Sequence, residues 1–377
     1  MNLFLFTFTR TIFNTAYRMA YPFLGVFARA LGVDIETMSL ALTVRSIGGG
    51  ITPFVAPLAD SRGRKFGMLL GVGLFTLSMA LVVFWPTFPV LFLSMLFAAI
   101  GKYIFDPAMQ AFLSDRISYE RRGRVIAITE LGWSLSFVLG VPLMGFLIAR
   151  DGWMAPFPLL TLLGLLTFFL VIWQIPKDET PVGTAATVRM NFRSVLSYAP
   201  ALAGLSVGLW VTVANEVVNL IFGVWLEDSF GLQIAALGAS AAVIGVSEIG
   251  GEGLVAIFSD KLGKERAVAF GLVANSLAAL LLPLLGRTTF GALLGLFFFY
   301  ITFEFTIVSI LPMMTEVMPS ARATLMSFNV AALSLGRAIG APLGPFLYRF
   351  GFPVVALGAV LFNFIALMAL RRLAKSR

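Results

Sequence analysis

The sequence has no cysteine and no histidine, and charged residues make up only 12% of its 377 positions. Without cysteine and histidine it can form no disulfide, no Cys/His zinc site, no thiol nucleophile and no imidazole proton relay. A soluble domain carries about 25% charged residues, about twice the share found here. Hydrophobic residues make up 59% of the chain, more than a soluble core can bury. The composition therefore predicts an integral membrane protein.

The N-terminal stretch MNLFLFTFTR has no basic lead-in and no small-residue cleavage site, and it continues into apolar sequence. It therefore predicts a first membrane-spanning helix rather than a secretory signal peptide. The net charge is +8, which basic loops on the cytoplasmic side of a membrane would explain. We therefore expect a lipid bilayer around the chain and no nucleic acid partner.

Charged segments divide the apolar sequence into six blocks. These segments are 60–65, 115–124, 177–193, 260–266 and 316–322. Because about 20 residues cross the hydrocarbon core, each block is long enough for two spans, and each has a turn signal near its middle. The turn signals are LGVDIE (31–36), WPTFP (85–89), RDGW (150–153), EDSFG (227–231), LGRTT (285–289) and RFGFP (349–353). Six blocks of two spans predict an all-α membrane protein with 12 transmembrane helices.

The basic residues predict how the chain is oriented in the membrane. Most of the 27 Lys and Arg residues lie in the charged segments or in the C-terminal tail RRLAKSR. In the six turns, or within two residues of them, lie only Arg29, Arg150, Arg287 and Arg349. Since positive residues collect on the cytoplasmic side, we expect both termini in the cytoplasm and the protein in the plasma (inner) membrane.

The two halves of the sequence match each other at an offset of 200 residues. Asp60 corresponds to Asp260, and WSLSFVLGVPLMGFL (133–147) corresponds to LSLGRAIGAPLGPFL (333–347). Parallel repeats of this kind characterise one large class of transporters. The predicted divisions are a six-helix bundle at 1–175, a cytoplasmic linker at 176–193 and a second, pseudo-symmetric six-helix bundle at 194–377.

Three motifs give the sequence a resemblance to a known family. PLADSRGRKFG (57–67) resembles the G-x-x-x-D-R-x-G-R-R/K signature of the major facilitator superfamily (MFS), with departures at Ala56 and Ser61. PAMQAFLSDRISYERRGRV (107–125) resembles the family's segment between helices 4 and 5, and GVPLMG and GAPLGP resemble its Gly/Pro motif. The resemblance covers nearly the whole chain. It implies a secondary transporter with alternating access, similar to the drug/proton antiporters, and it implies neither enzymatic activity nor a cofactor.

The resemblance also implies that the charged turn after the second helix closes a cytoplasmic gate. An acid at a helix end can accept hydrogen bonds from the N-terminus of a neighbouring helix. An exposed pair contributes only about 0–1 kcal/mol, which suits a contact that must open repeatedly. The alternative is a solvated turn with no gating role. The residues that match the gate are Asp60, Gly63, Arg64, Asp115, Arg122, Arg124, Asp260, Gly263 and Lys264.

Ionisable residues inside the predicted spans are functional candidates, because a charge at the bilayer centre costs at least about 2.5–3.5 kcal/mol. In the family, helices 1, 4, 7 and 10 line the central cavity. The candidates for a substrate and coupling site there are Asn14, Arg18, Tyr21, Lys102, Asp106, Glu216, Asn219 and Glu304. Secondary buried charges on flanking helices are Arg45, Glu130, Glu248 and Arg337. Arg10 and Glu252 are expected to lie near the cytoplasmic face and to extend to it.

Lys102 and Asp106 are four residues apart, so they should share one face of a helix. Burial and a nearby cation act on a carboxyl group in opposite directions. Asp106 could therefore bind a proton on one side of the membrane and release it on the other. It is our first choice for proton coupling, with Glu216 or Glu304 as the candidate in the second half. The alternative is that such pairs only hold helices together.

The function that we expect is proton-coupled efflux of small amphipathic, drug-like compounds by a monomer. An alternative is a transporter of an anionic solute or (lyso)lipid, whose negative group would meet Arg18 and Lys102. A remote alternative is a membrane sensor or scaffold that transports nothing. A membrane enzyme is disfavoured, because the acids are scattered along the chain and not clustered. GRAIGAPLG (336–344) places three glycines on one face and predicts close packing of helices.

Overall fold

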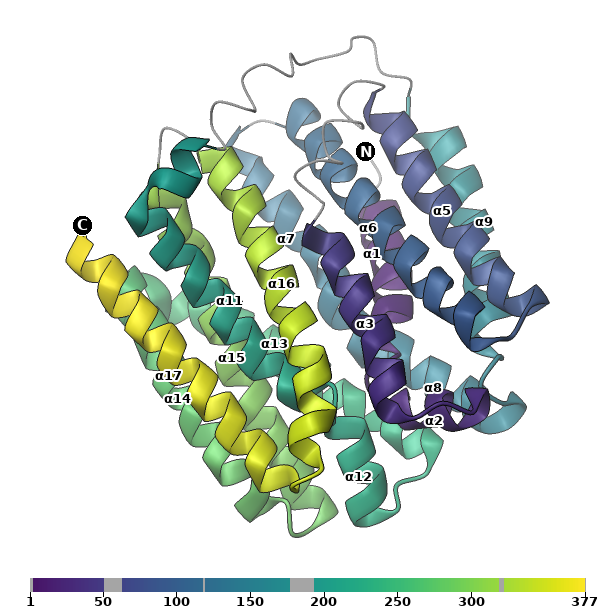
Figure 1. Ribbon diagram of the computed structural model, residues 1–377. Coiled ribbons are helices and arrows are strands. Elements are labelled where there is room, and N and C mark those ends of the chain that lie inside the picture. Colours follow the sequence, from purple (N-terminus) through teal and green to yellow (C-terminus); the bar gives the residue numbers. More distant parts are fainter. Residues whose placement is uncertain (1–2, 51–62, 118, 177–192, 319–321, 377) are drawn as a thin grey trace. The chain divides into compact units, whose positions relative to one another are not determined.

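The structure is a computed structural model, and it describes residues 3–50, 63–117, 119–176, 193–318 and 322–376. All of the elements that it describes are helices (Figure 1). Up to residue 174 they are α1 (Leu3–Arg18), α2 (Leu24–Leu31), α3 (Ile35–Gly50), α5 (Arg64–Phe84), α6 (Phe88–Arg116), α7 (Tyr119–Leu135), the π-helix η1 (Ser136–Gly140), α8 (Val141–Asp151) and α9 (Pro156–Gln174). From residue 199 they are α11 (Ala199–Asn219), α12 (Phe222–Phe230), α13 (Ile234–Leu262), α14 (Lys264–Leu285), α15 (Thr289–Val317), α16 (Arg322–Tyr348) and α17 (Phe352–Ser376).

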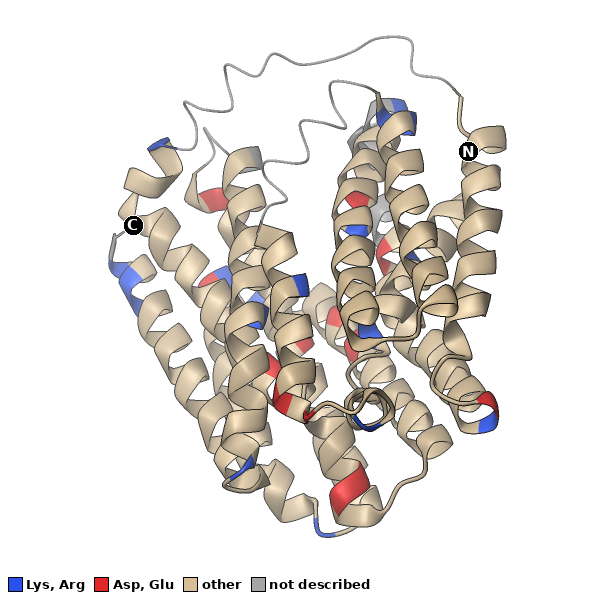
Figure 2. Ribbon diagram, turned by 45° about the vertical axis from the view of Figure 1, so that its right-hand side comes forward, with Lys and Arg blue, Asp and Glu red and all other residues tan. Residues whose placement is uncertain are grey.

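Ten of the described helical stretches are long and apolar enough to cross a membrane. The two remaining predicted spans correspond to the broken helix formed by α1 and α2, and to α3. All six turn signals lie where one helix ends and the next begins, as at Gly32, Gly152, Gly231 and Gly351. Charged residues are sparse along the ribbon (Figure 2). The predicted all-α membrane fold is therefore confirmed.

The first helix of each repeat is interrupted at the same place. α1 ends at Arg18 and α2 begins at Leu24, while α11 ends at Asn219 and α12 begins at Phe222. Pro22 lies in the first break and cannot donate a helical hydrogen bond. Broken helices at membrane depth are tolerated where the backbone is buried in protein or lines a water-filled cavity, so both breaks mark places where polar chemistry is expected.

Two further features recur at the offset of 200 residues. Gly63 and Gly263 precede α5 and α14 with φ of 99° and 82°, a conformation that glycine adopts without steric cost. In the first repeat, a Cβ on Gly71 of α5 would lie 2.6 Å from the carbonyl oxygen of Gly101 on α6. In the second repeat, a Cβ on the corresponding Gly271 would lie 3.1 Å from Cα of Thr306 on α15. Small residues thus let equivalent helix pairs approach closely in both repeats.

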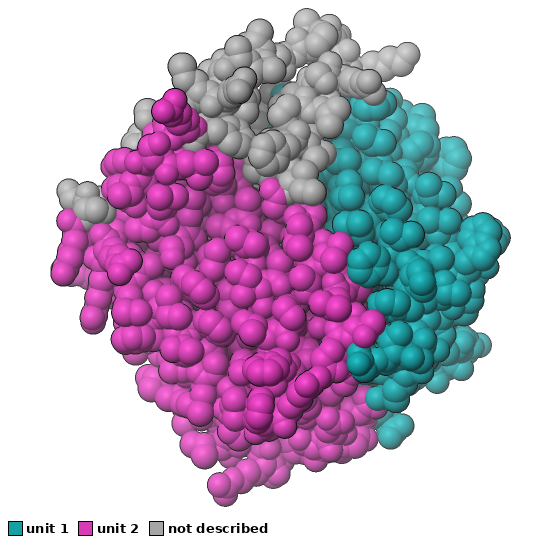
Figure 3. Space-filling view, in the orientation of Figure 1, with its two compact units in different colours: residues 1–34, 51–184, 233–242 teal, residues 35–50, 185–232, 243–377 magenta. Residues whose placement is uncertain are grey.

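The contacts divide the chain into two compact units, coloured separately in Figure 3. Unit 1 comprises Met1–Asp34, Ile51–Thr184 and Gln233–Ala242, and unit 2 comprises Ile35–Gly50, Ala185–Leu232 and Val243–Arg377. α3 belongs to unit 2 because it packs along α16. The start of α13 belongs to unit 1, where Gly238 lies against Gly145. The division by contacts thus groups two segments differently from the division by sequence, and most of the predicted linker lies outside the described residues.

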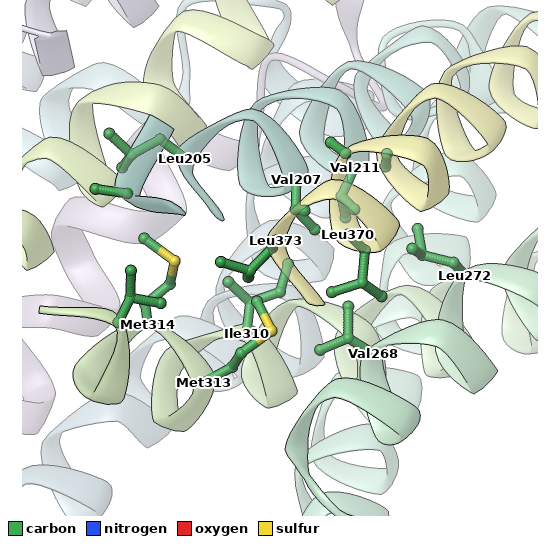
Figure 4. Close-up of a cluster of buried hydrophobic side chains, with 14 of the residues drawn as sticks. Leu205, Val207, Val211, Val268, Leu272, Ile310, Met313, Met314, Leu370 and Leu373 are labelled. Carbon is green, nitrogen blue, oxygen red and sulfur yellow. The ribbon is translucent and has the colours of Figure 1, made fainter. Parts of the chain in front are cut away.

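Each unit has its own packed interior. In unit 1, aromatic rings join three helices: Phe13 of α1 lies 4.4 Å from Phe75 of α5 and 5.4 Å from Phe105 of α6 between ring centroids. In unit 2, aliphatic and methionine side chains from α11, α14, α15 and α17 form the cluster of Figure 4. The glycines of 336–344 pack on α11, where a Cβ on Gly340 would lie 2.6 Å from Cβ of Glu216. The predicted close packing of that stretch is confirmed.

Candidate functional site

A polar stripe runs along α1 in unit 1. Arg10, Asn14 and Arg18 follow one another at intervals of four residues, and their exposed fractions are 5%, 0% and 3%. Residues four apart lie on one face of a helix. Tyr21 is buried in the break after α1. A helix that crosses an apolar membrane thus directs a row of hydrogen-bonding and cationic groups into the protein.

Arg10 connects two acidic side chains on two other helices of unit 1. Its guanidinium binds Glu130 of α7 through two nitrogens, at 2.5 and 2.8 Å. Its Nε lies 3.4 Å from Asp106 of α6. The Nζ of Lys102 lies 2.5 Å from the second oxygen of Asp106, so the predicted shared face is confirmed. The Gln110 amide donates to Glu130 at 3.4 Å. The result is a buried ion network that joins α1, α6 and α7.

The aromatic and ionic contacts fix how these helices run past one another. Phe6 meets Phe112, Arg10 meets Asp106 and Phe13 meets Phe105, so α1 and α6 are antiparallel. With a rise of 1.5 Å per residue, this register brings Asn14 level with Lys102. α1 and α7 instead run parallel, since Thr7 donates to the carbonyl of residue 128 and Arg18 to that of residue 133.

Arg18 is held by aromatic rings at the end of α1. Its guanidinium carbon lies 4.2 Å from the ring centroid of Trp133 and 3.4 Å from that of Phe137, and its NH1 donates to the carbonyl of Trp133 at 3.0 Å. Phe137 belongs to η1, the π-helical turn before Pro142. Such turns accommodate proline within a helix and often occur at functional sites. Here the turn carries the ring that contacts Arg18.

In unit 2, two of the predicted acids are buried. Glu216 is fully buried on α11 and accepts a hydrogen bond of 3.4 Å from Asn219. The Tyr300 hydroxyl of α15 donates to the Asn219 amide oxygen at 2.8 Å. Glu304, also on α15 and 7% exposed, packs against Gly251 of α13. The structure therefore brings Glu216 and Asn219 together directly and places Glu304 one helical turn beyond Tyr300.

The unit 2 interior also contains an amide network that sequence reasoning missed. Asn363 of α17 donates to the Asn275 side chain of α14 at 2.8 Å. Asn275 donates in turn to the carbonyl of Phe299 at 2.7 Å and to Thr302 at 3.1 Å. A single buried asparagine on a helix is a weak signal, and its partners emerge only once the helices are packed.

The structure also describes the burial of the predicted secondary charges and of Arg10. Arg45 and Glu248 of unit 2 are 1% and 3% exposed, and Arg337 is half-buried. Glu130, predicted as a secondary charge, belongs to the ion network. The expectation that Arg10 extends to the membrane surface is wrong, because its guanidinium is buried between Asp106 and Glu130. The interval of four residues from Arg10 to Asn14 and on to Arg18 was the signal that could have revealed it.

The predicted gate is described only in part. Gly63 and Gly263 precede their helices as described above, and Arg64 begins α5. Lys264 forms an ion pair with Glu316. Asp60 lies outside the described residues, and so do the side chains of the remaining predicted gate residues. These are Asp115, Arg122, Arg124 and Asp260.

The fold and the buried polar groups define a multi-pass membrane transporter. The model of the Major Facilitator Superfamily matches residues 3–324 and 205–377, and the chain belongs to this family. It is 24% identical over 354 residues to the MFS-type transporter YceJ of Bacillus subtilis (strain 168), covering 92% of this chain and 89% of YceJ. It is 22% identical over 329 residues to the inner membrane transport protein YdhP of Escherichia coli (strain K12), covering 85% and 82%.

The solved structures agree on the fold. The crystal structure of a D-xylose-proton symporter superposes with a TM-score of 0.79 at 16% identity, covering 97% of this chain and 96% of the symporter. At this identity the likeness concerns the fold alone. Family and fold together make the chain an MFS secondary transporter and not an enzyme. Members of this family typically carry small molecules.

Proposed function

We propose that this transporter is driven by protons and exports small amphipathic compounds, with Asp106 as the residue that couples the two. The supporting observation is the position of Asp106 between Lys102 of its own helix and Arg10 of α1. A carboxylate that bridges two cations on two helices links its own charge to the packing of those helices.

The energetics of buried pairs explain how a proton could move the helices. Removing one partner of a buried ion pair costs about 3–5 kcal/mol, because the other charge is left uncompensated. A proton on Asp106 removes the negative charge that Arg10 and Lys102 share. Arg10 then retains Glu130, so a bound proton favours a rearranged network over the present one. Glu216 or Glu304 is proposed for the equivalent role in unit 2.

Substrate contacts are proposed for the polar side chains on the predicted cavity helices. Asn14, Arg18 and Tyr21 lie on or just after α1, Lys102 lies on α6 and Asn219 lies at the end of α11. Their support is burial inside an apolar chain, where polar side chains are costly and usually functional. Both helix breaks adjoin this set, which places irregular backbone beside the polar groups.

The gate, the orientation and the assembly complete the proposal. We place the charged turns before α5 and α14 on the cytoplasmic side, with both termini, on the strength of the positive-inside rule. The inner membrane is supported by the name of YdhP. The glycine turns at Gly63 and Gly263 support paired gate segments that include Asp60 and Asp260. A monomer is proposed as the working unit.

The test is transport by the purified chain in proteoliposomes that contain a pH-sensitive dye. Compounds that raise the melting temperature of the protein are selected first, and their movement is followed with and without a pH gradient. Asp106→Asn should abolish proton movement driven by the compound, because no titratable group remains at this position. Asp151→Asn, an exposed acid at the end of α8, is the matched control. Unchanged coupling in Asp106→Asn would remove Asp106 from the mechanism.

A further inference from the structure

Asn14 is the most unusual polar side chain of unit 1. It is completely buried, and neither its amide nitrogen nor its amide oxygen has a hydrogen-bond partner among the residues that the structure describes. Roughly 90% or more of buried polar groups in proteins are hydrogen-bonded, and an unsatisfied one costs about 1–3 kcal/mol. A ligand that supplied the missing partners would remove this cost.

The position of Asn14 on α1 fixes what its amide faces. It lies one turn after Arg10 and one turn before Arg18, on the side of α1 that meets α6 and α7. The antiparallel register brings it level with Lys102, whose Nζ lies 6.0 Å from the ring centroid of Trp133. The amide therefore lies between two cationic side chains of α1, level with Lys102, which lies beside the ring of Trp133.

The aromatic surroundings indicate the body of the ligand. Trp133 contacts Arg18, and the ring centroid of Tyr17 is 6.5 Å from that of Trp133. Phe137 also lies against the Arg18 guanidinium, whose carbon is 3.4 Å from its ring centroid. Stacking on two rings orients the guanidinium before any ligand arrives, so little side-chain entropy is lost on binding. Flat apolar surfaces beside donors are typical of sites for small organic molecules.

We infer that Asn14 and Arg18 bind the oxyanion of an aromatic carboxylate or sulfonate, whose ring lies against Trp133. The inference rests on the proposed transport of amphipathic compounds and specifies their charge. The amide nitrogen of Asn14 and the guanidinium of Arg18 both donate, so an oxyanion can accept from both. Hydrogen bonds to a charged group are about twice as strong as those between neutral groups. A cationic ligand would instead meet Arg18 at unfavourable range, while the charges of Arg10 and Lys102 are largely balanced by Glu130 and Asp106.

Three probes with one ring system separate the charges. They are naphthalene-2-sulfonate, the neutral naphthalene-2-sulfonamide and the cationic naphthylmethyl-trimethylammonium. Binding to the whole protein in nanodiscs of zwitterionic lipid is measured by isothermal titration calorimetry. We expect the sulfonate to bind at least about tenfold more tightly than the sulfonamide, which corresponds to about one charge-assisted hydrogen bond. The cation should bind most weakly.

Two substitutions at one position test the role of Asn14. Asn14→Leu removes both amide atoms at similar volume and should weaken sulfonate binding by about tenfold. Asn14→Asp keeps the shape but adds a negative charge, so it should weaken the sulfonate further and improve binding of the cation. Asn329→Leu is the control, because Asn329 of unit 2 is also fully buried with neither amide atom bonded to a described residue. It should leave the sulfonate affinity unchanged.

The possible results are distinct. Equal binding of sulfonate and sulfonamide, tighter binding of the cation, or no binding of any probe would overturn the inference. An equal loss in Asn14→Leu and Asn329→Leu would also overturn it, since the effect would then be a general cost of removing a buried amide. None of these results would bear on the proposed proton coupling, which is tested separately by the flux measured for Asp106→Asn. Loss of that coupling with sulfonate binding intact would leave the Asn14 site standing.

Discussion

The two units share a backbone plan but differ in the sign of their buried charge. In unit 1 the charged residues inside the spans are Arg10, Arg18, Lys102, Asp106 and Glu130. In unit 2 they are Arg45, Arg337, Glu216, Glu248, Glu252 and Glu304. Bases therefore outnumber acids three to two in unit 1, and acids outnumber bases four to two in unit 2. The repeat has kept its helix breaks and glycine contacts while its polar side chains have diverged.

The polar contacts differ in kind as well. The unit 1 network consists of ion pairs that join α1, α6 and α7. In unit 2 the contacts around Asn275 run through amides, a hydroxyl and a backbone carbonyl, and Asn219 joins the Tyr300 hydroxyl to the Glu216 carboxylate. Charge in a membrane interior costs more than neutral polarity. The ion network of unit 1 should therefore be more sensitive to a single substitution than the neutral contacts of unit 2.

The largest expected effect follows from removing the cation that two acids share. Arg10→Leu leaves Glu130 without its bidentate partner and Asp106 with Lys102 alone. Breaking a buried pair from one side costs about 3–5 kcal/mol. The free energy of unfolding in micelles, followed by intrinsic fluorescence, should fall by no more than that amount, because the 40% exposure of the Glu130 side chain weakens its pair with Arg10. Transport driven by a pH gradient should fall with it.

A double variant tests how much the Arg10–Glu130 ion pair itself contributes to stability. Arg10→Leu combined with Glu130→Leu removes both charges, so part of the lost stability should return. If the double variant is as unstable as the sum of the two single variants, the pair contributes no coupling energy. Unit 1 would then differ from unit 2 in composition but not in energetics.

Most of the architecture was predictable because it depends on local patterns. The length of the apolar blocks gave the spans, and residues such as Gly32 and Gly231 marked the turns. The interval of four between Lys102 and Asp106 correctly placed both on one face. Arg10 was misjudged because depth was judged from its position along one helix, whereas its burial depends on acids from two others. The grouping of α3 with α16 and the amide contacts of Asn275 likewise arise only from packing between helices.

An effect of intermediate size is expected at Gly140 and Gly340, which correspond to each other in the two repeats but have different neighbours. A Cβ on Gly140 would overlap the Thr15 hydroxyl in unit 1, and one on Gly340 would lie 2.6 Å from Cβ of Glu216 in unit 2. Overpacking costs about 1–3 kcal/mol. Gly140→Ala and Gly340→Ala should both lower the melting temperature. Only Gly340→Ala should also slow transport, because it displaces a proposed coupling acid.

The control for these glycines is Gly253 of α13, around which an added Cβ would meet no atom within 4 Å in the described part of the chain. Gly253→Ala should be neutral or stabilising, since alanine favours a helix by up to about 1 kcal/mol. Equal slowing of transport by Gly140→Ala and Gly340→Ala would mean that tight packing, and not the identity of the neighbour, limits the rate.

The smallest effect is expected in the neutral network of unit 2. Tyr300→Phe removes the hydroxyl that donates to Asn219 at 2.8 Å and leaves the ring in place. One neutral hydrogen bond contributes about 0.5–1.5 kcal/mol, so the free energy of unfolding should fall by no more than that. Within the described part of the chain Asn219 then keeps its contact with Glu216, and transport should be slowed less than by Arg10→Leu. A loss of stability or transport as large as that of Arg10→Leu would contradict the contrast between the ion pairs of unit 1 and the neutral hydrogen bonds of unit 2. It would show that Tyr300 stabilises the charged form of Glu216 through Asn219.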